Sequence, residues 1–163
     1  MALSEIEQRL ADRFREWTLD LFEGDPRFVR IVDVTTERRK EAEFVVRFEV
    51  GRESCYEVAF CPQDRVIQVG FLTQDLSLND AIEHGGLESG ETLTEMLQVE
   101  LDDMGETGRY EVDHFFERPW FCFYTALPFE TITDLESDEL RLKVQHLLDA
   151  LHLVFQDYVE REK

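Results

Sequence analysis

The sequence predicts a single α+β domain over residues 1–163, built on an antiparallel sheet of five to six strands with helices packed on one face. Apolar residues recur every three or four positions near both ends of the chain, which is typical of amphipathic helices. Between these ends, apolar and polar residues alternate with period two, which is typical of strands. No linker, repeat or low-complexity tract interrupts the pattern. The expected order is therefore helix, three or four strands, a helical region, two strands and a final helix.

Residues 4–22 are predicted to form the first helix. Ser4 and Glu7 have the spacing of a capping box, in which each side chain accepts from the main-chain N–H of the other. The apolar residues that follow fall on one helical face, so this helix is expected to lie on the sheet. Gly24 and Pro26 are expected to end it.

Four strands are predicted next, at residues 28–34, 44–50, 55–61 and 66–72. Alternation is clearest at 44–50, where four apolar residues share one face and the charged residues lie on the other. The charged segment 37–41 is expected to join the first two strands. The other connections are short enough for hairpins, which predicts an antiparallel meander.

Residues 75–104 are predicted to be a helical region in two pieces. A short helix over 80–83 is expected to end at the glycines that follow, and a second helix is expected to begin near Thr92. The segment 85–90, GGLESG, has neither the lysine nor the preceding strand of a phosphate-binding loop. We therefore expect it to be a flexible linker between the two helices.

Two further strands are predicted at residues 109–116 and 120–127, followed by the strongest helical pattern in the chain. This last helix is expected to begin near Asp134 or Ser137 and to run to about Arg161. At 1.5 Å per residue it would span about 36 Å, enough to cross a whole sheet. It is expected to be the main cover of the sheet's inner face.

The charge balance is strongly acidic, with 37 Asp and Glu against 17 Lys and Arg and a formal net charge of −20. Such a surface repels nucleic-acid phosphates and anionic lipids, so neither is an expected partner. Solubility or salt adaptation is the favoured explanation of such a charge, and the charge also allows a basic protein partner. Hydrophobic residues make up 43% of the chain, which is enough for a folded core and argues against disorder.

A cytoplasmic location is expected. Residues 1–14 lack the basic start, apolar middle and small-residue cleavage site of a secretory signal. The three cysteines, an odd and small number, argue against a disulfide framework and suit a reducing compartment.

No catalytic, cofactor or metal site is predicted. Cys55 and Cys61 would lie about 20 Å apart on an extended strand, too far to share an ion. A Cys122 and His114 pair on neighbouring strands is the one nucleophilic arrangement that the pattern allows. The alternative hypothesis is a small enzyme that uses this pair or an acidic site. The favoured interpretation of the same two residues is a buried cysteine and a tolerated histidine.

The strand at 120–127 is apolar on both faces, unlike an ordinary strand in a sheet that is covered on one side. If the odd-numbered residues face the helices, the opposite face carries the candidate interface, Trp120, Cys122, Tyr124 and Ala126. Burying the two large rings is worth about 5 kcal/mol. The cover could be another part of the chain, a second copy in a homodimer, or a different protein.

The strand WFCFYTALPF, leading into LESDELRLKVQHLLDALHLVFQDYV, resembles the YbjN family and the type III secretion chaperones, whose folds are similar. The resemblance covers most of residues 4–160 and rests on the order of elements and the acidic composition. It implies a non-catalytic homodimer that holds extended segments of partner proteins. The expected function is therefore a protein-binding module. An acidic mimic of nucleic acid that binds a basic protein is a further alternative.

Overall fold

The computed structural model describes residues 3–34 and 42–160 and confirms the predicted α+β architecture. The helices are α1 (Glu5–Asp20), α2 (Leu76–Ser89), α3 (Leu93–Asp103), the 3-10 helix η2 (Ile132–Glu136) and α4 (Asp138–Glu160). The strands are β1 (Arg30–Asp33), β2 (Phe44–Val50), β3 (Ser54–Cys61), β4 (Val66–Thr73), β5 (Asp113–Glu117) and β6 (Trp120–Pro128). The predicted connection at residues 37–41 lies outside the described residues.

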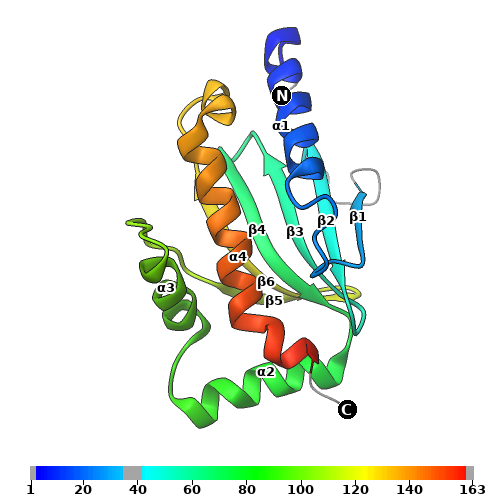
Figure 1. Ribbon diagram of the computed structural model, residues 1–163, viewed down its shortest axis with the longest axis vertical. Coiled ribbons are helices and arrows are strands. Elements are labelled where there is room, and N and C mark those ends of the chain that lie inside the picture. The colour runs from blue at the N-terminus through cyan, green and yellow to red at the C-terminus, as the bar shows by residue number, and fades with distance from the viewer. Residues whose placement is uncertain (1–2, 35–41, 161–163) are drawn as a thin grey trace.

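All neighbouring strands are antiparallel, and the sheet order is β1-β2-β3-β4-β6-β5. The first four strands form the predicted meander. The chain then leaves the sheet for α2 and α3 and returns as the β5–β6 hairpin, with β6 beside β4 (Figure 1). In consequence β1 and β5 are the two edges of the sheet.

The core lies between the sheet and the two long helices, α1 and α4, which cross the same face (Figure 1). Register places four aromatic residues side by side on this inner face, Phe48, Tyr56, Phe71 and Phe123. From α4, Phe155 stacks on Phe71 with 4.5 Å between ring centroids. These rings are almost fully buried, and their burial supplies much of the hydrophobic stabilisation.

The prediction of a flexible linker at residues 85–90 is wrong. Helix α2 continues through Gly85 and Gly86 and ends at Gly90, whose φ of 74° is the left-handed conformation of a helix C-cap. Gly85 is needed for packing, because a Cβ there would lie 2.3 Å from the hydroxyl of Tyr158 on α4. The glycine pair therefore marks a close helix contact and not a break.

The strand predicted at 109–116 is shorter in the structure, where β5 begins only at Asp113. Just before it, the main-chain N–H of Val112 donates to the Thr94 hydroxyl on α3 at 2.9 Å. The ring of Tyr110 is buried in the main core. The residues before β5 are therefore engaged by α3 and the core, which delays the start of the strand.

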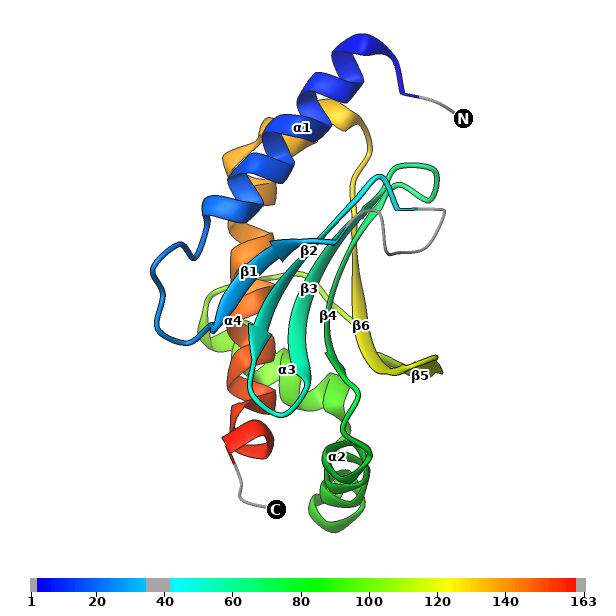
Figure 2. The ribbon, with the colours of Figure 1, turned by 90° about the vertical axis from the view of Figure 1, so that its right-hand side faces the viewer.

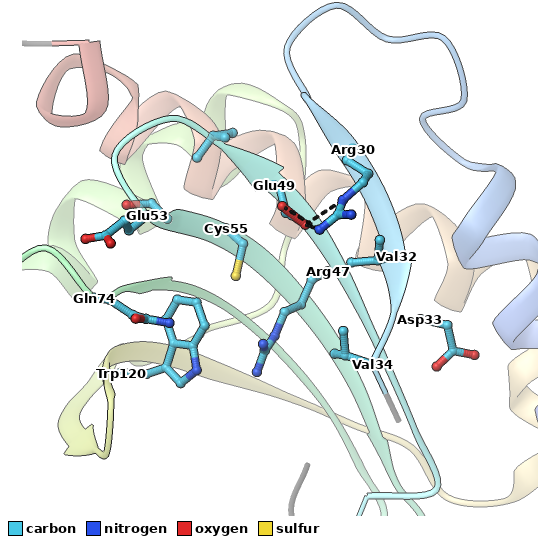
Figure 3. A pocket seen from close by; sticks show the side chains of 12 residues that line it. Arg30, Val32, Asp33, Val34, Arg47, Glu49, Glu53, Cys55, Gln74 and Trp120 are labelled. Carbon is cyan, nitrogen blue, oxygen red and sulfur yellow. Dashed lines mark hydrogen bonds and ion pairs between the residues drawn. The ribbon is translucent and has the colours of Figure 1, made fainter. Parts of the chain in front are cut away.

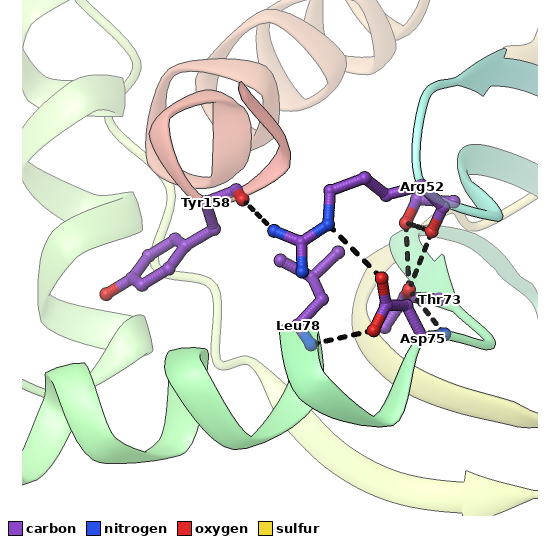
Figure 4. Close-up of polar contacts among 6 residues, drawn as sticks. Arg52, Thr73, Asp75, Leu78 and Tyr158 are labelled. Carbon is purple, nitrogen blue, oxygen red and sulfur yellow. Dashed lines mark hydrogen bonds and ion pairs between the residues drawn. The ribbon is translucent and has the colours of Figure 1, made fainter. Parts of the chain in front are cut away.

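Arg52 connects the β2–β3 turn to the ends of two helices (Figure 4). Its Nη1 donates to the main-chain carbonyl of Tyr158 near the C-terminus of α4 at 2.8 Å, and its Nε donates to the Asp75 carboxylate at 3.2 Å. Asp75 is the N-cap of α2 and accepts from the N–H of Leu78 at 3.1 Å. A cation at a helix C-terminus and an anion at an N-terminus both complement the helix dipole. These contacts hold Arg52 at a φ of 59°, which residues other than glycine rarely adopt.

His152 lies half-buried on α4, with its ring centroid 5.8 Å from that of Tyr56 and 6.3 Å from that of Phe28. Burial, followed by the nearby Arg27 guanidinium, lowers the pKa of His152 below its ordinary value of 6.5. The folded protein therefore binds a proton at this ring less readily than the unfolded chain does.

This difference predicts a pH-dependent stability contribution. Because the folded pKa is lowered, the contribution is fully present above about pH 6.5 and is lost as the pH falls below it. Between about pH 7.5 and pH 5.5, the unmodified protein should lose more free energy of unfolding than His152→Leu does. Urea denaturation at the two pH values measures this change in the free energy of unfolding. The control is His84→Leu on the exposed side of α2, which should follow the unmodified protein; parallel curves for all three proteins would contradict the prediction.

Candidate functional site

The face of the sheet opposite α1 and α4 carries no helix among the residues that the structure describes (Figure 2). We call it the outer face. The four predicted interface residues of β6 all belong to it, since their inner-face neighbours Phe123 and Leu127 join the main core. The face assignment made from the sequence is thus the one that the fold adopts.

The four residues differ in exposure. Cys122 and Tyr124 are 0% and 3% exposed, Trp120 is half-buried and Ala126 is exposed. The chain itself therefore covers the middle of this set, and none of the described helices lies over it. Of the four, only Trp120 and Ala126 remain accessible to another molecule. A homodimer through this face would therefore bury less apolar surface than the sequence predicts.

Residues of the sheet itself contribute to the cover. Tyr124 lies over Gly70 of β4, where a Cβ would be 2.3 Å from the Tyr124 Cδ1 atom. From the edge strand, the ring of Phe115 packs against Tyr124 with 5.7 Å between centroids. Cys55 and Leu72 complete this small second core. Because glycine leaves a gap on β4, the tyrosine ring can lie flat and reach across that strand.

A polar row crosses the outer face at the same level. Register aligns Arg47 of β2, Glu57 of β3, Gly70 of β4 and Tyr124 of β6. Arg47 Nε donates to one carboxylate oxygen of Glu57 at 2.9 Å, and the Tyr124 hydroxyl donates to the other. Glu57 is 0% exposed, so these hydrogen bonds help to stabilise its charge in place of water. This network was not predicted from the sequence. Its only signal in the sequence is one charged residue in the middle of each of two paired strands, Arg47 in β2 and Glu57 in β3.

A pocket of about 510 Å³ lies beside this row, between β1 and Trp120 (Figure 3). The guanidinium of Arg47 reaches across it and lies 4.7 Å from the centre of the Trp120 ring, which is a cation–π contact. On the far wall, Arg30 and Glu49 form an ion pair with distances of 2.8 and 3.0 Å. Val32 and Val34 add apolar surface.

The three cysteines are buried thiols that are not joined in disulfides. Burial strongly raises the pKa of the Cys55 thiol, so this group stays protonated and is a poor nucleophile. The predicted alternative of a Cys122 and His114 pair is wrong, because the two side chains lie on opposite faces of the sheet. His114 stacks on Phe123 of the inner face at 4.1 Å between centroids, and its Nε2 lies 3.0 Å from Asn79 Oδ1. Over the described parts of the chain, no three His, Cys, Asp or Glu residues converge as metal ligands.

The edge strand β5 is the most exposed part of the sheet. Phe115 and Phe116 are 40% and 57% exposed, which is unusual for large rings in a strand. On the outer face Phe115 lies between Asp113 and Glu117. The strand was predicted, but its role as an edge depends on the return of the chain beside β4, which periodicity does not reveal.

Comparison of the chain with protein-family models, curated proteins and solved structures finds no match. The resemblance to the YbjN family and the type III secretion chaperones therefore stays a prediction. Within the described residues, no helix is both long and apolar enough to cross a lipid bilayer.

Gly70→Ala should destabilise the protein by about 1–3 kcal/mol, because the added methyl group has no space beneath the Tyr124 ring. The free energy of unfolding from urea denaturation measures it. Gly51→Ala is the matched control, since nothing lies within 4 Å of a Cβ at that glycine. Equal stability of the two variants would show that Tyr124 does not occupy the gap on β4.

Removing one partner of the buried ion pair should be far more harmful than removing both. Arg47→Met leaves Glu57 charged and buried, and should lower the free energy of unfolding by about 3–5 kcal/mol. Adding Glu57→Gln removes that charge and should recover a large part of the loss. A double-mutant cycle by urea denaturation measures the coupling.

The control cycle uses Arg9→Met and Glu5→Gln on α1, an ion pair at 3.0 Å with side chains 66% and 84% exposed. Its coupling should be below about 1 kcal/mol. Similar coupling in both cycles would contradict the stabilising role of the buried pair.

Proposed function

We propose that the chain is a non-catalytic protein-binding module that receives an extended segment of a partner protein along the open edge of β5. The observation that carries the proposal is an exposed edge strand with two exposed phenylalanines in an acidic chain. A strand at a sheet edge offers unpaired N–H and C=O groups at every second residue, and these groups can bind an added strand. β5 pairs with β6 alone among the strands that the structure describes.

The side chains of β5 define the kind of segment that fits. On the outer face, an added strand would place one residue beside Phe115 and the residues two positions away beside Asp113 and Glu117. An apolar residue flanked by lysine or arginine at those positions complements this row. The net charge of −20 also steers basic segments toward the protein and speeds their association.

A second copy of the chain fits this edge poorly. Antiparallel pairing of two β5 strands about Phe115 would place Asp113 of one copy opposite Glu117 of the other, and like charges in directly opposed positions destabilise a sheet. The segment is therefore proposed to come from a different protein. A homodimer, expected from the sequence, would have to form through another surface.

The class of partner follows from the charge of the surface, and the proposed location follows from the cysteines. The acidic surface opposes binding to nucleic acid and to anionic membranes, so a protein is the proposed partner. Buried thiols that are not joined in disulfides suit a reducing compartment, and the proposed location is the cytoplasm.

The test uses an acetylated and amidated peptide, Lys-Thr-Val-Thr-Lys, titrated into ¹⁵N-labelled protein. Amide chemical-shift changes should concentrate on β5, because the peptide forms main-chain hydrogen bonds there. A peptide with both lysines replaced by glutamate should bind at least tenfold more weakly, because it meets Asp113 and Glu117 with like charge.

The protein variant Phe115→Asp should weaken binding of the lysine peptide by a similar factor. Its matched control is Leu87→Asp, which changes an equally apolar and still more exposed residue on α2. Equal binding of the two peptides, or shift changes that lie away from β5, would contradict the proposed function.

A further inference from the structure

We propose that the pocket between β1 and Trp120 binds a carboxylate that carries an apolar body, with Arg47 holding the two carboxylate oxygens. This site is separate from the β5 edge, so the inference goes beyond the proposed function and does not depend on it. Its ligand chemistry follows from the state of the Arg47 guanidinium, the charges around it and the walls of the pocket.

The Arg47 side chain is only 10% exposed, yet most of its hydrogen-bonding capacity is unused. Nε donates to Glu57, and the plane of the guanidinium lies over the Trp120 ring. Neither terminal nitrogen has a hydrogen-bond partner among the residues that the structure describes. A guanidinium presents its N–H groups as a rigid planar fork, which matches the two coplanar oxygens of a carboxylate. The network therefore orients the fork and leaves its end available.

The neighbouring charges favour a monoanion over a phosphate. Glu49 is neutralised by Arg30, and Asp33 lies 3.5 Å from Arg15, so these two carboxylates are engaged within the chain. Glu53 also lines the pocket and adds a third negative charge. They still repel an entering anion, and a dianion more than a monoanion. Arg47 itself is already paired with Glu57 and can balance little further negative charge. A single carboxylate satisfies the free N–H groups with the least added charge.

The remaining walls are suited to an apolar body. Val32 and Val34 line one side, and the half-buried Trp120 ring lines the other (Figure 3). The volume of about 510 Å³ is within the range of small-molecule pockets, about 300–1,000 Å³. Both a free aryl or alkyl carboxylic acid and the C-terminus of a peptide that ends in an apolar residue have this chemistry.

The test uses Trp120 fluorescence in a Trp17→Phe background, so that one tryptophan remains. Trp17 stacks on Phe14 of α1, away from the outer face. Phenylacetate should produce a saturable change on excitation at 295 nm. Phenylacetamide, which has the same ring but no charge, should bind at least tenfold more weakly. This comparison needs no change at Arg47, so it stands even where a variant is unstable.

In the same background, Arg47→Lys should weaken phenylacetate binding at least tenfold, because lysine keeps a positive charge beside Glu57 but has no planar fork. Arg9→Lys on the exposed side of α1 is the matched control and should bind as the parent does. Thermal unfolding of each variant shows that it is folded at the temperature of the titration.

Acetyl-Gly-Phe with a free C-terminus distinguishes the two sources of the carboxylate, a free carboxylic acid and a peptide C-terminus. Tighter binding than phenylacetate identifies a peptide terminus as the ligand, and weaker binding identifies a free acid. Three outcomes would overturn the site: no saturable change with either acid at millimolar concentration, equal binding of phenylacetate and phenylacetamide, or an unchanged affinity in a folded Arg47→Lys protein. The peptides that test the β5 edge have amidated C-termini and present no terminal carboxylate to Arg47. Failure of the β5 proposal is therefore distinguishable from failure of the Arg47 pocket.

Discussion

The outer face is organised around one constraint, the burial of the Glu57 carboxylate on a sheet face that no described helix covers. A charge with no exposed surface needs close partners, and Arg47 and Tyr124 both bind the Glu57 carboxylate. Tyr124 reaches it only because Gly70 leaves a gap between them. This requirement ties the register of β2, β3, β4 and β6 together, since a slip of one residue at any step would move a partner to the opposite face. It also explains how the centre of an apolar second face is closed although no described helix lies over it.

Much of the fold could be predicted from periodicity, because each strand and helix shows its pattern locally. The alternation at 44–50 and the apolar stripe of α4 are examples. The failures depend on residues distant in the sequence. Gly85 looks like a helix breaker until Tyr158 packs against it, and β5 starts late because Thr94 engages the residue before it. Such contacts exist only after the chain has folded, so local propensity cannot report them.

The candidate site was predictable to a smaller extent. Strand parity placed Trp120, Cys122, Tyr124 and Ala126 on the same face, but exposure depends on what neighbouring strands contribute at that level. The same parity explains why His114 and Cys122 do not meet, although they are on paired strands. The result is a face with a closed centre and two open features at opposite sides, the β5 edge and the Arg47 pocket. A macromolecule and a small acid could therefore occupy the face together without competing for a residue.

Arg52 links the pocket to the far end of the chain. Its neighbours Glu53 and Ser54 line the pocket, while its own side chain holds the main chain of Tyr158 in the last turns of α4. Fraying of those turns would release the arginine and loosen the rim of the pocket. By thermodynamic reciprocity, a molecule that stiffens the rim must also tighten the C-terminal end of α4 by the same free energy.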